Sequence, residues 1–264
     1  MNPVEVSSGD SPVVLGMPHT GTLLPPEIMA RLNARGQRLL DTDWHIQKLY
    51  EGLLPGATTV RATFHRYVID ANRAPDDESL YPGQNTTSLV PLTDFDGEAI
   101  WTHPIEPDEV AARRDAFHAP YHAALAAELD RVRDRHGVAI LYDCHSIRSH
   151  IPFLFEGRLP DFNIGTSNGA TCDRQVQDAT LEICANTRVY SHILNGRFKG
   201  GWTTHHYGRP AEGLHAIQME LAQITHLEAE TPPFAFSEAK AARLRPVLAE
   251  ILHRLADLAP SLRS

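Results

Sequence analysis

The sequence is poor in cysteine, in positive charge and in long apolar runs, and each shortage excludes a class of protein. Its 3 cysteines are odd in number and none stands in C-x-x-C spacing, so we expect reduced thiols rather than a disulfide framework. Lysine and arginine total 24 against 33 acidic residues, and the formal charge of −9 removes the usual electrostatic basis for binding nucleic acid. No apolar stretch reaches the roughly 18 residues of a membrane span, and residues 1–10 do not resemble a signal peptide. We therefore expect a soluble, cytoplasmic protein.

Several ligand-binding motifs are missing as well. The chain has no G-x-x-x-x-G-K-[ST] sequence, and Gly16 and Gly21 do not form a G-x-G-x-x-G motif, so neither a P-loop nor a dinucleotide site is indicated. No histidine stands in the H-E-x-x-H pattern of a helical zinc site. A metal site would have to be assembled from residues that are far apart in the sequence.

What the chain does have is an alternation of strands and helices. With 42% apolar residues it can bury a sizeable core, and we expect a single domain over residues 1–264. The alternation predicts an α/β fold, a three-layer αβα sandwich around a mixed, mainly parallel central sheet. Strands are expected near 13–17, 57–62, 67–71, 138–144, 153–155, 162–165, 189–194 and 216–220, and helices near 25–35, 43–53, 106–136, 173–186 and 237–258. Pro120 should kink or split the long helix, which should end at Gly137.

Residues 74–103 interrupt this alternation. They are rich in proline, glycine, aspartate, asparagine and threonine and show no sustained period. A loop of this length in a compact domain usually serves as a lid or a binding loop, or is disordered. We assign it as a long active-site loop, and we expect a second, glycine- and aromatic-rich loop at 198–208.

Four of the short apolar runs end abruptly in residues that can do chemistry. Buried strands of an α/β sheet read as such runs, and ligands bind outside the carboxyl ends of these strands. The side chains that follow should therefore converge on one edge of one sheet, where they would make up a metallohydrolase site. They are His19 after 13–17, Asp70, Asn72 and Arg73 after 67–69, Asp143 and His145 after 139–142, and Glu220 after 216–219.

His19 and His145 are the candidate metal ligands among these residues. Zinc and similar ions take imidazole and carboxylate ligands, and a catalytic site uses about three protein ligands plus a water. The alternative for each histidine is an ordinary turn or packing role. Asp143 lies on the same face of its strand as His145 and would orient it or a nearby arginine, or else serve as a capping residue.

Glu220 and the tetrapeptide at 70–73 suggest catalysis and substrate binding. A carboxylate at the end of a buried apolar strand is costly unless it is paired or functional, so Glu220 is either a general base or the partner of an arginine. Asn72 and Arg73 place an amide beside a forked donor, which suits a ligand that carries a carboxylate.

Two other features are assigned structural roles. His118 and His122 have the i, i+4 spacing of a helical chelate, but Phe117 and Tyr121 stand beside them, so we expect packing or surface roles for both histidines. Cys144 stands next to His145 but should point to the opposite face of the strand, so the two should not form a nucleophile and base.

A series of short motifs resembles a known family when taken in order along the chain. They are Pro18-His19-Thr20-Gly21, Asp41-Thr42-Asp43-Trp44, Arg66-Tyr67, Asp70-Ala71-Asn72-Arg73, Leu80-Tyr81-Pro82-Gly83-Gln84, Asp143-Cys144-His145-Ser146, Asn195-Gly196-Arg197-Phe198-Lys199-Gly200-Gly201, Tyr207-Gly208 and Gln218-Met219-Glu220-Leu221. This set resembles the N-formylglutamate amidohydrolase family and, more distantly, the zinc carboxypeptidases and aspartoacylases. The resemblance implies their phosphorylase/hydrolase-like fold.

The resemblance also implies roles for individual residues. His19 and His145 match the two metal-binding histidines of the group, but Thr22 stands where the distant relatives have a glutamate ligand. Asp43 is therefore expected as the third ligand of one divalent ion, zinc by analogy, with Asp41 as the alternative. Arg66 matches the arginine that polarises the scissile carbonyl, Asn72 and Arg73 match the pair that binds the substrate carboxylate, and Glu220 matches the glutamate that activates water.

One position departs from the family pattern. The family has an arginine before its His-Tyr-Gly triplet, whereas this chain has His205 there. We expect His205 and Tyr207 to contribute to the substrate site. Arg209 is the first candidate for the second carboxylate contact, and Arg148 and Lys199 are the others.

These assignments predict a metal-dependent amidohydrolase that cleaves N-formyl-L-glutamate to formate and L-glutamate in histidine degradation. The alternatives are another N-acyl amino-acid deacylase, of the acetylaspartate or succinylglutamate type, and a non-catalytic protein that binds acidic metabolites. The expected partner is a small anionic N-acyl amino acid. Homo-oligomers are common for such domains, so self-association is a further expectation.

Overall fold

The computed structural model describes residues 2–263 and is built on one mixed sheet of seven strands in the order β1-β3-β2-β4-β7-β5-β6. The central strands β3, β2, β4 and β7 are mutually parallel, whereas β1 and β5 each run antiparallel to their inner neighbour. The predicted α/β fold with a mainly parallel, mixed sheet is confirmed. The strands are β1 Val4–Ser7, β2 Val13–Met17, β3 Thr58–Ala62, β4 Ala139–Ile147, β5 Phe162–Gly165, β6 His192–Leu194 and β7 Leu214–Ala222.

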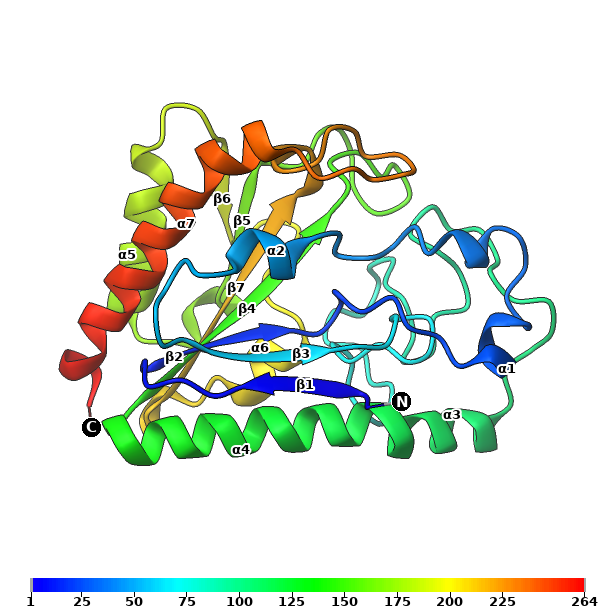
Figure 1. Cartoon of the computed structure of the whole chain (residues 1–264), viewed down its shortest axis with the longest axis horizontal. Helices are drawn as coiled ribbons and strands as arrows, with labels where there is room; N and C mark the ends of the chain where they lie inside the picture. Colours follow the sequence, from blue (N-terminus) through cyan, green and yellow to red (C-terminus); the bar gives the residue numbers. More distant parts are fainter. Residues whose placement is uncertain (1, 264) are drawn as a thin grey trace.

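Helices cover both faces of the sheet and complete three layers (Figure 1). On one face α4 (Ala119–His136) runs beneath β1, β3 and β2, continuing from the short α3 (Pro107–Arg113). On the other face α5 (Arg174–Asn186) and α7 (Glu238–Leu258) lie side by side, with α2 (Ile46–Tyr50) next to them over the sheet. The remaining helices are α1 Pro26–Met29 and α6 Trp202–Tyr207.

The alternation of strand residues divides the core between the two faces. Val13 and Leu15 of β2 pack with the leucines of α7, whereas Val14 between them packs with Leu125 and Leu129 of α4. Strands that are buried on both faces need such uninterrupted apolar runs, which is why β2 and β4 are so hydrophobic. Every residue of β4 and β7 is buried, so a polar side chain there has to be paired or functional.

The register of the two central strands positions the site. Strands β4 and β7 pair in parallel so that His145 lies beside Glu220. On the other side of β4, Gly16 of β2 lies beside Asp143, and His19 follows two residues after β2 ends. The carboxyl ends of three neighbouring strands therefore place these side chains at one edge of the sheet, as predicted.

The long helix is interrupted where the sequence predicted. A π-helical turn at Arg114–His118 joins α3 to α4, and Pro120 is the second residue of α4. A proline cannot supply the backbone N–H that a regular α-helix would use at this point, so the widened turn accommodates it. Gly137 ends α4 in the left-handed conformation, at φ 74°.

Several predicted elements are wrong or shorter than expected. No strand forms at 67–71 or at 153–155: Val68 and Ile69 are buried in the core, but their segment is a series of turns. The expected helices at 25–35 and 43–53 shrink to α1 and α2. Part of the expected loop at 198–208 is the helix α6.

Residues 74–103 form a long irregular segment, as predicted, held by isolated bridges such as Thr93 to Ala99. Within residues 2–263, none of the helices combines the length and the apolarity that a membrane span requires.

Candidate active site

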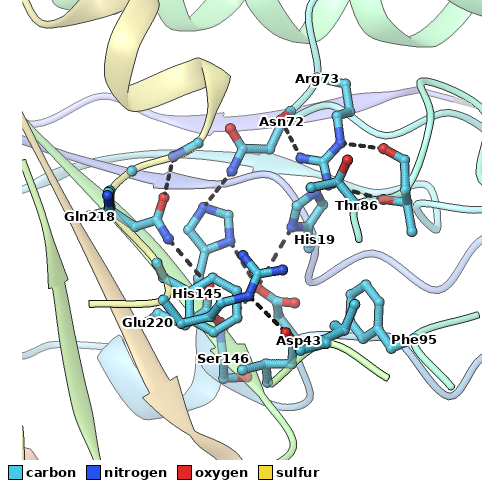
Figure 2. Close-up of a pocket in the computed structure, with 18 of the residues that line it drawn as sticks. His19, Asp43, Asn72, Arg73, Thr86, Phe95, His145, Ser146, Gln218 and Glu220 are labelled. Atoms are coloured by element: carbon cyan, nitrogen blue, oxygen red, sulfur yellow. Dashed lines mark hydrogen bonds and ion pairs between the residues drawn. The ribbon is translucent and has the colours of Figure 1, made fainter. Parts of the chain in front are cut away.

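Two histidines and one aspartate gather at the carboxyl edge of the sheet (Figure 2). One ligand atom each from His19, Asp43 and His145 lies within 4.8 Å of the others, and all three side chains are buried. His145 belongs to β4, and His19 lies in the turn after β2. Asp43 lies in the segment before α2, where its backbone N–H donates to the carbonyl of His19 at 3.1 Å. The structure thus brings together the three residues that the sequence and the family resemblance nominated.

Each histidine is oriented by a carboxylate on its outer side. Nε2 of His19 lies 2.7 Å from Oδ1 of Asp70, and Nε2 of His145 lies 3.0 Å from Oδ1 of Asp143. The two Nδ1 atoms turn toward Oδ2 of Asp43, at 3.8 Å and 3.1 Å respectively. A carboxylate that holds the far nitrogen fixes the ring and its tautomer, which is the usual arrangement around metal-binding histidines. The expected role of Asp143 in orienting His145 agrees with this contact.

Burial and the charged groups around the two histidines shift the pKa values of the two rings in opposite directions. Burial and the neighbouring Arg66 guanidinium lower the pKa of His19, which favours the neutral imidazole that a metal requires. Burial also opposes the charged form of His145, but the carboxylates of Asp143 and Asp43 outweigh it and raise the pKa of His145 well above its usual value. Two imidazoles and a carboxylate are the donor set of catalytic zinc sites, so the residues present fit one divalent ion.

Arg66 lies against this cluster on its pocket side. Its guanidinium donates to Nδ1 of His19 and lies 3.8 Å from Oδ1 of Asp43. The ring of Phe95 stacks on it, 4.9 Å from the guanidinium carbon to the ring centroid. Its Nε is buried without a partner in the structure, and the side chain as a whole is only 6% exposed. An arginine that is this confined is aimed at the space beside His19 and Asp43.

Glu220 is the buried carboxylate next to the cluster. Burial raises the pKa of Glu220 to about 8, although the charge of His145 acts in the opposite direction. Nε2 of Gln218, on the same face of β7, donates to Oε2 of Glu220 at 3.3 Å. No arginine makes an ion pair with Glu220 among the described residues, so the alternative of a structural arginine partner has no support.

Asn72 and Arg73 lie in the turn segment after Asp70. Nδ2 of Asn72 contacts Nε2 of His145 at 3.2 Å, and its Oδ1 accepts a hydrogen bond from the backbone of Thr203 at 2.8 Å. Gly201 allows this approach, because a Cβ at that position would overlap the Asn72 amide. Arg73 is held by the carbonyl and hydroxyl oxygens of Thr87 at 2.7 Å and 3.0 Å and faces the pocket.

A pocket opens directly over these side chains and encloses about 720 Å³ of empty space including its mouth. Its size suits a small molecule. Tyr81, Asn85, Thr86, Thr87 and Phe95 of the 74–103 loop form part of its wall.

Arg197 lines the same pocket, and sequence reasoning did not nominate it. Burial and the positive charge of Arg73, which lines the same pocket, lower the pKa of Arg197. Its donors are fixed by the backbone of Leu154 and Asn85 at 2.9 Å and 2.8 Å. Its place in a basic, glycine-rich stretch after β6 was the available signal. Lys199, one of the three alternatives for a second carboxylate contact, also lines the pocket.

Other predicted substrate residues lie elsewhere, and these predictions need correction. Arg209 is 42% exposed and pairs with Glu212, and His205 is exposed on α6. Tyr207 is buried, but its hydroxyl contacts His122 rather than the pocket. Arg148 pairs with Asp96. Helix α6 explains the error for His205, because the helix turns Thr203 and Thr204 toward Asn72 and Asp143 and leaves His205 exposed on its other side.

Asp41, the alternative third ligand, is also engaged elsewhere. Its Oδ2 accepts hydrogen bonds from the hydroxyl of Tyr67 and the backbone of Phe95, both at 2.9 Å. Burial raises its pKa to about 7. Of the two aspartates, Asp43 is the one that faces both histidines.

A buried group of histidines and carboxylates under a pocket at the carboxyl edge of an α/β sheet is typical of the active site of a hydrolase. Residues 11–227 match the family model of N-formylglutamate amidohydrolase. The chain belongs to this family.

Similar proteins of known name agree. The chain is 46% identical over 250 residues to an N-formylglutamate deformylase of Pseudomonas putida and 45% identical over 250 residues to one of Pseudomonas aeruginosa, with 94% of this chain and 93% of each relative covered. A crystal structure of an N-formylglutamate amidohydrolase from Ralstonia eutropha JMP134 superposes with a TM-score of 0.84 at 26% identity, covering 99% of both chains.

Proposed function

We propose that the chain hydrolyses N-formyl-L-glutamate to formate and L-glutamate, with one divalent ion held by His19, Asp43 and His145. The observation that carries this proposal is the juxtaposition of this cluster with Glu220, Arg66 and a pocket lined by two arginines. Membership of the family supports the substrate. Zinc is the proposed metal, and histidine degradation is the process that would supply such a substrate.

Substrate recognition follows from the two pocket arginines. N-formylglutamate carries two carboxylates, and Arg73 and Arg197 each bring one guanidinium group to the pocket, held in place by bonds to the protein. Arg–carboxylate pairs are directional as well as strong, so two of them would select an acidic amino acid over a neutral one. Because the chain as a whole has a charge of −9, these cations are best explained by an anionic ligand. Lys199 is placed to add to the positive charge of the pocket.

Different residues around the cluster can carry out different steps of the reaction. A bound divalent ion would lower the pKa of its water and polarise the formyl oxygen. Arg66 is placed to donate to that oxygen as it gains negative charge. Glu220 takes the proton of the attacking water and gives it to the leaving amine of glutamate. Positive charge beside Glu220 favours its ionised form, which is the form that a base requires.

The direct test measures release of the free amino acid from a matched set of substrates, together with the acid that leaves with it. We expect activity with N-formylglutamate and much weaker activity with N-formylglutamine, which lacks one carboxylate. Activity should also be weak with N-acetylglutamate and N-succinylglutamate, which differ in the acyl group, and with N-acetylaspartate, which differs in both the acyl group and the amino acid. Release of acetate or succinate as the faster reaction would indicate another deacylase. Tight binding of N-formylglutamate without hydrolysis would indicate the binding protein instead.

The self-association and the cytoplasmic location expected from the sequence stay predictions.

A further inference from the structure

The segment 70–73 carries three groups of the site but has no regular structure of its own. Asp70 holds His19, Asn72 contacts His145, and Arg73 faces the pocket. Turn segments are the least constrained parts of most folds, yet side chains at a catalytic centre need to be held to within a fraction of an ångström. Something outside the segment has to fix its backbone.

Side chains from the helix beneath it supply that support. Nε2 of His122 lies 2.8 Å from the carbonyl oxygen of Ala71, and Nε2 of His118 lies 2.9 Å from that of Arg73. One turn earlier, Nη1 of Arg113 donates to the carbonyl oxygens of Val68 and Tyr67 at 3.0 Å and 3.3 Å. The two histidines are therefore bonded to the backbone carbonyl groups of the two residues that flank Asn72.

The π-helical turn explains why these side chains reach the same segment. In a regular α-helix Arg113 and His118 would point roughly 140° apart, because each residue advances by about 100°. The turn at Arg114–His118 has wider i→i+5 spacing and brings His118 back toward the face that Arg113 occupies. His122, four residues further on, follows His118 on that face, and the two rings lie 4.4 Å apart.

The same histidines also contact helix α6. The ring of His122 packs edge-on against Trp202 at 4.7 Å, and its Nδ1 lies 3.1 Å from the hydroxyl of Tyr207. Helix α6 in turn binds Asn72 through the backbone of Thr203 and binds Asp143 through the hydroxyl of Thr204. Burial lowers the pKa of His118 and that of His122, the latter to about 3, so both rings are neutral and Nε2–H is the donor toward each carbonyl.

We propose that His118 and His122 are positioning residues of the active site and act on different parts of it. His122 fixes the peptide between Asp70 and Asn72, and so sets the orientation of the two candidate metal-binding histidines. His118 fixes the peptide of Arg73, and so sets the guanidinium that faces the substrate. This proposal replaces the expectation from the sequence that both histidines only pack against their neighbours or lie at the surface. The expected changes in kcat and KM rest on the proposed function. The expected change in Zn²⁺ affinity does not depend on it.

Four substitutions separate positioning from packing, and one of them, His118→Phe, removes the donor to the Arg73 carbonyl. His122→Phe keeps a ring against Trp202 and removes the donor, whereas His122→Gln loses the ring but keeps an amide donor near the place of Nε2. His206→Phe is the matched control, because His206 stacks on Trp202 in the same cluster, at 4.3 Å, and its side chain makes no hydrogen bond to the 70–73 segment. Affinity for Zn²⁺, measured by competition with a chelating dye, gives a readout that is independent of catalysis.

We expect His122→Phe to weaken Zn²⁺ binding and to lower kcat, each by about 10-fold to 100-fold, as the loss of outer contacts at metal sites usually does. His122→Gln should recover most of both losses. His118→Phe should mainly raise KM for N-formylglutamate, with Zn²⁺ affinity close to that of the wild type. His206→Phe should change neither.

Different outcomes identify different failures. If His122→Phe and His118→Phe lose thermal stability but match His206→Phe in Zn²⁺ affinity, kcat and KM, the histidines are packing residues and the proposal is wrong. If His122→Phe does not fold, His122→Gln and the shorter His122→Asn take its place, and equal Zn²⁺ affinity in these two would overturn it. A wild type that binds Zn²⁺ but releases no formate would refute the proposed function and leave the positioning test by Zn²⁺ affinity intact.

Discussion

At the scale of single residues, the site depends on which buried polar groups have partners and which do not. His19 and His145 each have a carboxylate behind the ring, whereas among the described residues the Glu220 carboxyl accepts a hydrogen bond only from Gln218, and burial raises its pKa. A carboxyl group buried with so little compensation is costly to the fold, which is the usual mark of a functional group.

Glu220 is predicted to be the base. Glu220→Gln keeps the size of the side chain and removes its ability to accept a proton, so kcat should fall by about 10²-fold to 10⁴-fold. Folding and metal content should be unchanged, as circular dichroism and elemental analysis would check. A variant with near-normal kcat would assign the base to another group.

The raised pKa of Glu220 also predicts a pH dependence of stability. The pKa of about 8 in the folded protein lies above the ordinary 4.5, so the folded state holds a proton that the unfolded state releases. The contribution of this group is therefore fully present at low pH and is lost as pH rises from about 4.5 to about 8, by at most about 1.4 kcal/mol per pH unit. Urea unfolding of metal-free protein across this range should show a shallower decline for Glu220→Gln than for the wild type. Parallel curves would show that the folded protein does not hold this proton.

Arg197 is predicted to bind one of the two substrate carboxylates. Arg197→Ala and Arg73→Ala should each lower kcat/KM for N-formylglutamate by about two orders of magnitude, since losing one member of a buried charge pair costs about 2–5 kcal/mol. The losses should be much smaller on amidated analogues that lack the matching carboxylate. Arg209→Ala is the control, because Arg209 is an exposed arginine outside the pocket lining and should have little effect. Equal losses on acid and amide substrates would mean that the arginines support the fold instead.

At the scale of elements, the strands that carry the site were predictable and the segments between them were less so. Strands β2, β4 and β7 are buried on both faces, so their apolar runs are distinct in the sequence. The run at 67–69 looks the same but forms turns, because its carbonyl groups bond to Arg113 rather than to a neighbouring strand. Such a long-range partner leaves no local pattern. For the same reason Arg197 was missed, since its place depends on the 74–103 loop and on Leu154.

The close contact between α6 and the 70–73 segment gives a prediction at this scale. Gly201→Ala would push its Cβ into the Asn72 amide, so we expect kcat/KM to fall at least about 10-fold with a stability loss of about 1–3 kcal/mol. Gly196→Ala is the matched control in the same stretch, because its Cβ would meet only the half-exposed Ile193 side chain. Kinetics and thermal unfolding of the two variants check this. If Gly201→Ala and Gly196→Ala had similar kinetics and stability, the site would not require the close approach of α6 to Asn72.

At the scale of the whole molecule, an acidic chain concentrates positive charge where its substrate would bind. The formal charge is −9, yet Arg66, Arg73, Arg197 and Lys199 all line one pocket. The α/β architecture explains how this arises: parallel strands deliver their ends to one edge, and the long 74–103 loop and the stretch after β6 close over it. The fold class and the convergence of His19, Asp43 and His145 follow from the strand pattern and the family motifs. The walls of the pocket could not be predicted in this way, because the loops that form them have no periodic pattern of apolar residues.

The central claim is that hydrolysis needs one divalent ion held by His19, Asp43 and His145. Formate release from N-formylglutamate, measured while Zn²⁺ is titrated into chelator-stripped protein, tests it most directly. Activity should be absent at the start, rise in proportion to added metal and level off at about one ion per chain. Asp43→Ala should need far more metal to reach its maximum, whereas Asp41→Ala should titrate like the wild type. Full activity in protein that elemental analysis shows to be free of metal would contradict the account.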